Sequence, residues 1–396
     1  MRHLLPIPPA VTNRSPVPAI LTLRRLGAVI AIAAITAGCQ STPEPAAPPS
    51  IKDDLVITSR AWRKSHGMPA ARDLLADALI QRDADNGSLE KRVLRTNADK
   101  AITFPDALAS LPRHQREQTA IFLVLGFHTK ARRSEPVIRQ VEVFLKQQGW
   151  HAVLVPIPEH GTPEEDAVAI QKSLEQELPK VRRAVVIGFS KGSLDWMHWF
   201  ARQSKDLAPA QRDKIRLMIS FAGALRGAAV ADWMAHGKGT IPALLRARVN
   251  SQTDKALAVM TSTAGDPWRD GAAPDLGREF PRLQAINIVA APDGKDGFTD
   301  VDGKFRMLSK LSTGQWPWLG PVDGLVETAG QVLPPESGVP QHIVRVFGSH
   351  AVLDGQYANG SVVSKIYREG GENYWMGGEE LLDDMMRAIP AKLVWK

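Results

Sequence analysis

The chain has 396 residues, of which 44% are hydrophobic and 23% charged, the balance of an ordinary globular protein with a sizeable core. Lys and Arg number 49 against 42 Asp and Glu, which gives a net charge of +7. This mild excess is spread along the chain and no nucleic-acid-binding motif is present, so we expect no nucleic-acid partner. The excess favours solubility, with weak attraction to an anionic membrane surface as the alternative.

The N-terminal segment has the pattern of an export signal. Arg24 and Arg25 precede an apolar run over 26–37, and the small residue Gly38 follows. A charged patch, about 7–15 apolar residues and a small residue are typical of a secretory signal. The run is too short for a bilayer-spanning helix, which takes about 20 residues.

The only cysteine of the chain, Cys39, follows this run, so no intramolecular disulfide can form. The stretch 36–39 (Thr-Ala-Gly-Cys) resembles the lipobox of bacterial lipoproteins, with Thr36 where Leu is usual. The resemblance implies a signal peptide over 1–38, lipidation of Cys39 and export to a membrane. Gln40 next to the cysteine implies the outer membrane in a Gram-negative host. The alternative is a plain signal peptide.

Two segments precede the first predicted strand. Residues 39–52 are Pro-rich, which predicts a semi-rigid tether. Residues 53–118 are polar with apolar positions at helical spacing, which predicts a helical extension without an assigned chemistry. The apolar positions that carry this prediction are Leu74, Leu75, Ala78 and Leu79.

From residue 119 onward, buried strands alternate with helices. Apolar runs predict strands at 121–125, 151–155, 184–187, 215–221, 285–290 and 342–347. Helical stripes predict helices at 135–148, 163–178 and 191–204, and Thr162-Pro163-Glu164-Glu165 is typical of a capping box. This alternation predicts a mainly parallel central sheet with helices on both faces.

Two long connections, 224–282 and 291–341, interrupt the alternation. Insertions of this length are often lids or binding loops. We expect 224–282 to form a cap over the reactive end of the sheet, with packing elsewhere as the alternative.

The strongest chemical motif is Gly188-Phe189-Ser190-Lys191-Gly192, between a buried strand and a helix. G-x-S-x-G in this setting places a serine on a strained turn that exposes its hydroxyl. Here the sequence resembles the α/β-hydrolase superfamily over about 119–390, and its lipase-like branches in particular. Three further stretches carry the resemblance, 125–128, 224–228 and 320–326, although Leu125 and Ala224 replace the usual His and Pro.

A serine hydroxyl needs a base, and an acid orients that base. In this fold the order is Ser, acid, His. His350 follows the last predicted strand and is favoured as base over His342, which begins that strand. The resemblance favours Asp323 as the acid. Asp293 and Asp296, after the strand at 285–290, are the alternatives.

The resemblance also implies an oxyanion hole formed by the backbone N–H groups of Phe127 and Lys191. We expect the Lys191 side chain to be a solvated surface charge. Trp316 and Trp318 are core residues or line an apolar acyl pocket, and His160 lies on a loop at a strand end. No metal-ligand spacing or phosphate-binding loop occurs, so we expect neither metal nor cofactor.

These features predict an exported, membrane-anchored serine hydrolase that cleaves small-molecule or lipid esters by way of an acyl-enzyme. An acyltransferase or thioesterase using the same site is an alternative, as is a lipoprotein that keeps the scaffold only for binding.

Overall fold

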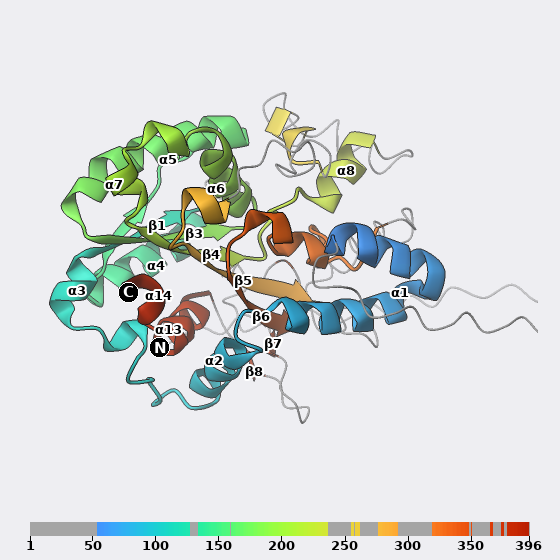
Figure 1. Cartoon of the computed structure of the whole chain (residues 1–396), viewed down its shortest axis with the longest axis horizontal. Coiled ribbons are helices and arrows are strands. Elements are labelled where there is room, and N and C mark those ends of the chain that lie inside the picture. The colour runs from blue at the N-terminus through green and yellow to red at the C-terminus, as the bar shows by residue number, and fades with distance from the viewer. Residues whose placement is uncertain are drawn as a thin grey trace, which may run out of the picture. The chain divides into compact units, whose positions relative to one another are not determined.

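The computed structural model (Figure 1) describes most of the chain beyond residue 53. The described residues are 54–126, 134–158, 160–236, 255–256, 258–261, 276–291, 319–347, 350, 365–366, 374–375 and 378–395. They belong to one compact unit, Pro48–Lys396.

A single sheet organises this unit, with the strand order β2-β1-β3-β4-β5-β6-β7-β8. The strands are β1 (Thr119–Val124), β2 (His151–Leu154), β3 (Arg183–Phe189), β4 (Ile215–Phe221), β5 (Gln284–Ala291), β6 (Gln341–Phe347), β7 (Lys365–Ile366) and β8 (Tyr374–Trp375). The pairings from β2 to β6 are all parallel, whereas β7 and β8 pair antiparallel at one edge. The six strands expected from the apolar runs are therefore present, and the two short antiparallel strands were not foreseen.

Helices cover both faces of the sheet (Figure 1). They are α1 (Leu55–Arg82), α2 (Ser88–Ala98), α3 (Arg113–Glu117), α4 (Ser134–Gln147), α5 (Pro163–Glu177), α6 (Lys191–Arg202), α7 (Pro209–Arg212), α8 (Ala229–His236), α11 (Leu276–Glu279), α13 (Gly378–Ala388) and α14 (Lys392–Trp395). The short 3₁₀ turns are η1 (Leu108–Ser110), η2 (Leu178–Lys180), η3 (Ser204–Asp206), η4 (Thr328–Gln331) and η5 (Pro335–Ser337). This parallel sheet, with its strand–turn–helix at β3 and α6, confirms the predicted α/β-hydrolase fold.

Local chemistry explains where these helices begin. The Thr162 side chain caps α5 by accepting the N–H of Glu165, whose carboxylate accepts the N–H of Thr162 in return, and Pro163 occupies the first turn. The expected capping box is therefore confirmed. Asp54 caps α1 in the same way, through the N–H groups of Val56 and Ile57.

The N-terminal extension packs on the sheet rather than standing apart from it. The path of α1 breaks at Gly67, which has a φ of 83°, because Pro69 cannot donate to the preceding turn. Apolar residues of α1, including Leu75 and Leu79, share a buried cluster with Val289 of β5 and Ile343 of β6. Helix α2 packs against α13 and β6. Among the described residues, no helix is long and apolar enough to cross a membrane.

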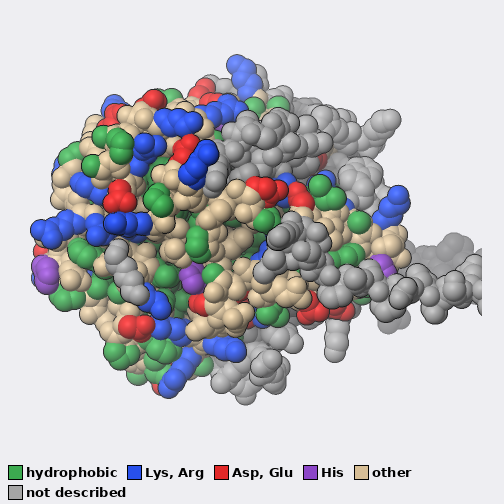
Figure 2. All heavy atoms as spheres, viewed as in Figure 1, with side chains coloured by type: hydrophobic (Ala, Val, Ile, Leu, Met, Phe, Trp, Pro, Cys, Tyr) green, Lys and Arg blue, Asp and Glu red, His purple; other side chains and the backbone are tan. Residues whose placement is uncertain are grey.

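The surface carries charges of both signs. Figure 2 shows Lys and Arg side chains interspersed with Asp and Glu over the viewed face. This distribution agrees with the mild and dispersed excess of positive charge in the sequence.

Candidate functional site

The site is built on the turn between β3 and α6. Ser190 sits there with a φ of 53° and a ψ of −118°, a strained conformation that costs about 1–3 kcal/mol. Glycines on both sides make the turn possible. A Cβ on Gly188 would lie 2.5 Å from Ser193 Cα, and one on Gly192 would lie 2.3 Å from the Val124 carbonyl oxygen. The G-x-S-x-G pattern thus has its two glycines where backbones nearly touch.

Backbone contacts hold the Ser190 turn in place. The Ser190 N–H donates to the carbonyl of Phe221 on the neighbouring strand β4, at 2.9 Å. The Ser190 carbonyl accepts the N–H groups of Ser193 and Ala224, both at 3.1 Å. The strained peptide is therefore fixed from the sheet and from the start of the insertion.

The structure brings together the three residues singled out as a triad. Ser190 Oγ lies 2.6 Å from His350 Nε2, and His350 Nδ1 lies 2.8 Å from Asp323 Oδ2. The His350 side chain is 7% exposed and that of Asp323 is fully buried. Since a carboxylate only accepts hydrogen bonds, Nδ1 carries a proton toward Asp323 and Nε2 is left to accept the Ser190 hydroxyl.

Asp323 is held by every one of its polar atoms. Its Oδ1 accepts the N–H groups of Leu325 and Val326, at 2.9 and 2.8 Å, and thereby closes its own loop. Its Oδ2 accepts Gln331 Nε2 at 2.9 Å as well as His350. Its carbonyl accepts the His350 N–H at 2.9 Å. The carboxylate therefore cannot rotate away from the imidazole without breaking several hydrogen bonds.

Gln331 was missed by sequence reasoning. Its amide oxygen accepts the Ala290 N–H at the end of β5, and its amide nitrogen donates to Asp323. It therefore ties the loop of Asp323 to the sheet. A glutamine eight residues after an aspartate carries no local signal that would have revealed this role.

Helix α1 supports the same loop from outside. Arg60 donates to both carboxylate oxygens of Glu327, and Glu327 Oε1 also accepts the Gly320 N–H at 2.7 Å. Arg63 donates to the Leu319 carbonyl at 2.6 Å. The extension, to which the sequence assigned no chemistry, thus holds both ends of the segment that carries Asp323.

The oxyanion donors were expected at Phe127 and Lys191, and Phe127 lies outside the described residues. Lys191 is the first residue of α6, where a backbone N–H has no acceptor within the helix. The end of β1 lies against the nucleophile, because a Cβ on Gly126 would come within 3.2 Å of Ser190 Cβ. The Lys191 N–H is therefore placed next to Ser190 at a helix N-terminus, where negative charge is favoured.

The expectation for the Lys191 side chain was wrong. It is 2% exposed and makes ion pairs with two carboxylates, Asp166 of α5 and Asp195 of α6, which are both fully buried. Spacing of i and i+4 between Lys191 and Asp195 was a readable signal for one of these pairs. Asp166, 25 residues earlier on another helix, was not readable from the sequence.

The remaining predicted residues fall into two groups. His342 contacts Asp85 rather than the site, with its Nδ1 2.9 Å from Asp85 Oδ2, and His160 is half-buried on the loop before α5. The others lie outside the described residues: Cys39, Asp293, Asp296, Trp316 and Trp318.

One group of potential metal ligands occurs within the described part of the chain, formed by Asp83, Asp85 and His342. Protein groups already use these carboxylates. Asp83 accepts the N–H groups of Gly87 and Ile343, and Asp85 accepts the N–H of Leu89 and contacts His342. The group thus fastens the connection between α1 and α2 to the start of β6.

Described parts of the 224–282 insertion pack beside the site. Ala228, Ala231 and Met260 form a buried cluster with Leu194 of α6 and Val326 of the Asp323 loop. The rest of the insertion, including 237–254, lies outside the described residues.

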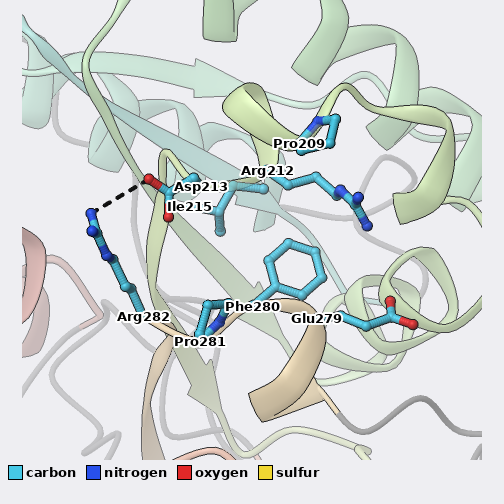
Figure 3. Close-up of a pocket in the computed structure, with 8 residues that line it drawn as sticks. All are labelled: Pro209, Arg212, Asp213, Ile215, Glu279, Phe280, Pro281 and Arg282. Atoms are coloured by element: carbon cyan, nitrogen blue, oxygen red, sulfur yellow. Dashed lines mark ion pairs between the residues drawn. The ribbon is translucent and has the colours of Figure 1, made fainter.

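A cavity of about 210 Å³ lies at the opposite end of the strands from Ser190, near the amino ends of β4 and β5 (Figure 3). It is lined by Pro209, Arg212, Asp213, Ile215, Glu279, Phe280, Pro281 and Arg282, and Arg282 pairs with Asp213 at 3.5 Å. Because Ser190 follows the carboxyl end of β3, this cavity is separate from the candidate site.

No protein-family model matches this sequence, and no curated protein matches it either. Solved structures share its shape at 14–16% identity. A metagenomic carboxyl esterase has a TM-score of 0.47 and covers 68% of this chain and 75% of its own. The mature lipase BlEst2 of Bacillus licheniformis has a TM-score of 0.43, with 59% and 85% covered. Phospholipase PlaB of Legionella pneumophila has a TM-score of 0.38, with 54% and 45% covered. Because these scores lie below 0.5, the α/β-hydrolase fold of this chain is assigned from its own strand order and from the turn at Ser190.

Proposed function

We propose that this chain is a serine hydrolase that cleaves carboxylic esters, with Ser190 as nucleophile, His350 as base and Asp323 as orienting acid. The observation that carries the proposal is the continuous chain of hydrogen bonds from Ser190 Oγ through His350 to Asp323, at 2.6 and 2.8 Å. A scaffold kept only for binding needs neither this chain nor a strained turn that presents the hydroxyl.

The geometry supports an acyl-enzyme mechanism. His350 Nε2 takes the hydroxyl proton while Ser190 Oγ attacks the ester carbonyl. The oxyanion that forms is stabilised by the backbone N–H of Lys191 and, by resemblance, of Phe127. His350 then protonates the departing alcohol. It later takes a proton from the water that attacks the acyl group, and it returns this proton to Ser190 Oγ as the carboxylic acid leaves. Asp323 stabilises the imidazolium in both halves of the reaction.

Labelling with a fluorophosphonate tests this proposal, with the modified peptide then located by mass spectrometry. Ser190 should be the labelled residue. Ser190→Ala should leave folding nearly intact and lower kcat for p-nitrophenyl butyrate by on the order of 10⁶-fold. Ser204→Ala is a matched control, because Ser204 is a buried serine whose hydroxyl donates to the Phe200 carbonyl, away from Ser190. A Ser190→Ala protein with full esterase activity would exclude the mechanism, and an inert wild type would favour the binding-protein alternative.

We further propose that the protein is an exported lipoprotein, anchored to a membrane through Cys39, with the Pro-rich tether holding the folded domain away from the membrane surface. The sequence pattern around Cys39 supports this proposal. Two or more acyl chains anchor a protein stably, whereas one chain binds only marginally. Lipid esters in the same membrane would then be within reach as substrates.

A further inference from the structure

Behind the nucleophile lies a charge cluster that the triad does not use. It consists of Lys191, the residue after Ser190, with Asp195 one turn further along α6 and Asp166 in the first turn of α5. The Lys191 side chain is 2% exposed and both carboxylates are fully buried. Lys191 Nζ donates to Asp166 Oδ2 and, at 2.8 Å, to Asp195 Oδ1.

The charges of this cluster do not balance if every group is ionised. Two carboxylates against one ammonium leave a net negative charge, and a buried uncompensated charge is strongly unfavourable. Each carboxyl group also has one buried oxygen, Asp166 Oδ1 and Asp195 Oδ2, that finds no donor among the described residues. A single proton on one of the two carboxyl groups makes the cluster neutral.

The surroundings of the two carboxyl groups indicate that Asp195 holds this proton. Burial raises the pKa of both carboxyl groups, and that of Asp195 well above its usual value. The charge of Asp166 adds to the rise in the pKa of Asp195, whereas Lys191 lowers the pKa of both carboxyl groups. Burial works against the Lys191 ammonium, but the two acids outweigh this effect and raise its pKa. Other titratable groups near the cluster are Glu165, on α5, and His198, on α6.

The cluster fastens the residue that follows Ser190 to a neighbouring helix. Ser190 is fixed by backbone hydrogen bonds, and Gly192 is fixed by its contact with the end of β1. Lys191 lies between them, and its side chain is fastened to α5, whose first turn is itself held by the Thr162 capping box. The carbonyl of the planar Ser190–Lys191 peptide is held by the N–H groups of Ser193 and Ala224, and the side-chain contacts of Lys191 add a second anchor to the residue that carries the peptide N–H.

We propose that Asp166, Lys191 and Asp195 form a neutral buried clamp, with one carboxyl group protonated, that positions the Lys191 N–H toward the oxyanion. This proposal rests on the proposed esterase function. These three side chains touch no reacting atom, so they are positioning residues. Their contribution should appear in the transition state rather than in substrate binding, since the oxyanion exists only there.

Two variants test the clamp. Asp195→Asn keeps an oxygen for Lys191 and replaces the carboxyl proton by an amide N–H, so kcat should stay within threefold of wild type. Lys191→Met combined with Asp166→Asn removes the clamp but leaves only neutral buried groups, so the protein should fold. Its kcat for p-nitrophenyl butyrate should fall about 100-fold, as for a misaligned donor, with KM changed less than threefold. Affinity for a trifluoromethyl ketone, which forms the same oxyanion, should fall in parallel.

Asp384→Asn provides the matched control. Asp384 is a fully buried aspartate on α13. It binds Arg387 on the same helix, Asn97 near the end of α2, and Lys100 just beyond α2. Its loss should lower the melting temperature and leave kcat and inhibitor affinity unchanged.

Two outcomes would overturn the clamp while the esterase proposal stands. One is wild-type kcat and inhibitor affinity in the folded double variant. The other is a fall in kcat in Asp195→Asn as large as that in the double variant. Should the double variant not fold, a fall of about 100-fold in the kcat of Asp195→Asn still overturns the clamp. A wild type that neither hydrolyses the ester nor reacts with fluorophosphonate overturns the proposed function, and the clamp with it.

Discussion

Asp323 uses its two carboxylate oxygens for different purposes. Oδ1 closes the loop 323–326 by accepting two backbone N–H groups, and Oδ2 faces His350 and Gln331. One residue therefore shapes its own loop and orients the imidazole. This arrangement explains why an Asp-Gly turn, ordinarily a surface feature, is fully buried here.

Asp323→Asn tests the orienting role. An amide nitrogen facing His350 Nδ1 favours the wrong tautomer, so kcat should fall by about four orders of magnitude. The loss of stability should be small, because the amide oxygen can still accept hydrogen bonds. Steady-state ester hydrolysis and a thermal melt measure the two effects. Asp293→Asn and Asp296→Asn should do much less, and the reverse ranking would move the acid to the earlier loop.

At the scale of elements, α1 and the loop that carries Asp323 behave as one unit. Arg60 and Arg63 of α1 bind Glu327 and the Leu319 carbonyl, and Arg226 binds the N-cap residue Asp54 at 2.7 Å. Apolar packing of α1 on β5 and β6 accompanies these polar contacts. The helix therefore reinforces a segment that the sheet also holds, through Gln331 and Thr328 among others.

Glu327→Gln measures this support. The change removes the charge facing Arg60 and weakens the acceptor for the Gly320 N–H, in a side chain that is only 6% exposed. The free energy of unfolding should fall by about 1–3 kcal/mol, and kcat should fall about tenfold as the loop loosens. Urea unfolding and ester kinetics check both values. Asp106→Asn removes a surface ion pair with Arg92 and should change neither the free energy of unfolding nor kcat by much. If the Glu327→Gln protein is destabilised but keeps the wild-type kcat, the contacts of α1 do not contribute to catalysis.

At the scale of the whole molecule, one buried histidine links stability to pH. Burial lowers the pKa of His198 on α6 to about 4, from an ordinary value of 6.5, with Arg202 and Lys191 acting in the same direction and Glu164 opposing them. Between pH 4 and pH 6.5, His198 binds a proton in the unfolded chain but stays neutral in the folded protein. The contribution of His198 is therefore fully present above pH 6.5 and is lost as the pH falls toward 4.

This loss amounts to about 3 kcal/mol, at about 1.4 kcal/mol for each pKa unit. His198→Gln cannot take up the proton, so its stability should decline less between pH 7 and pH 4. Urea unfolding of both proteins across this range gives the comparison. Asp166 and Asp195, whose pKa values are raised, act in the opposite sense, and both proteins contain them. If the free energy of unfolding falls with pH in parallel for the two proteins, His198 is not the group that links stability to pH.

Anchoring is a property of the whole chain as it is made in the cell. If Cys39 is lipidated, Cys39→Ala should move the protein from the membrane fraction to the soluble fraction of the exported material. The purified variant should keep its esterase activity, because the described site lies wholly within Pro48–Lys396. Fractionation followed by immunoblotting measures the first effect. Unchanged membrane association would count against the lipid anchor.

The six parallel strands and the turn that carries Ser190 could be predicted from the sequence alone. Each central strand is a run of apolar residues closed by turn signals, and this information is contained within a few neighbouring residues. The same is true of the α5 capping box and of the glycines on either side of Ser190. Chain order and the end of the last strand singled out His350, and resemblance to lipases singled out Asp323.

Which polar side chains meet could be seen only once the packed elements were described. Arg60 and Glu327 are 267 residues apart, and Lys191 and Asp166 belong to different helices. The periodicity of a helix shows which face is apolar, but it does not show which charge of another element lies against that face. For this reason Lys191 was predicted as a surface charge, and Gln331 and α1 received no role. Burial of such groups depends on how the elements pack together, which no local pattern records.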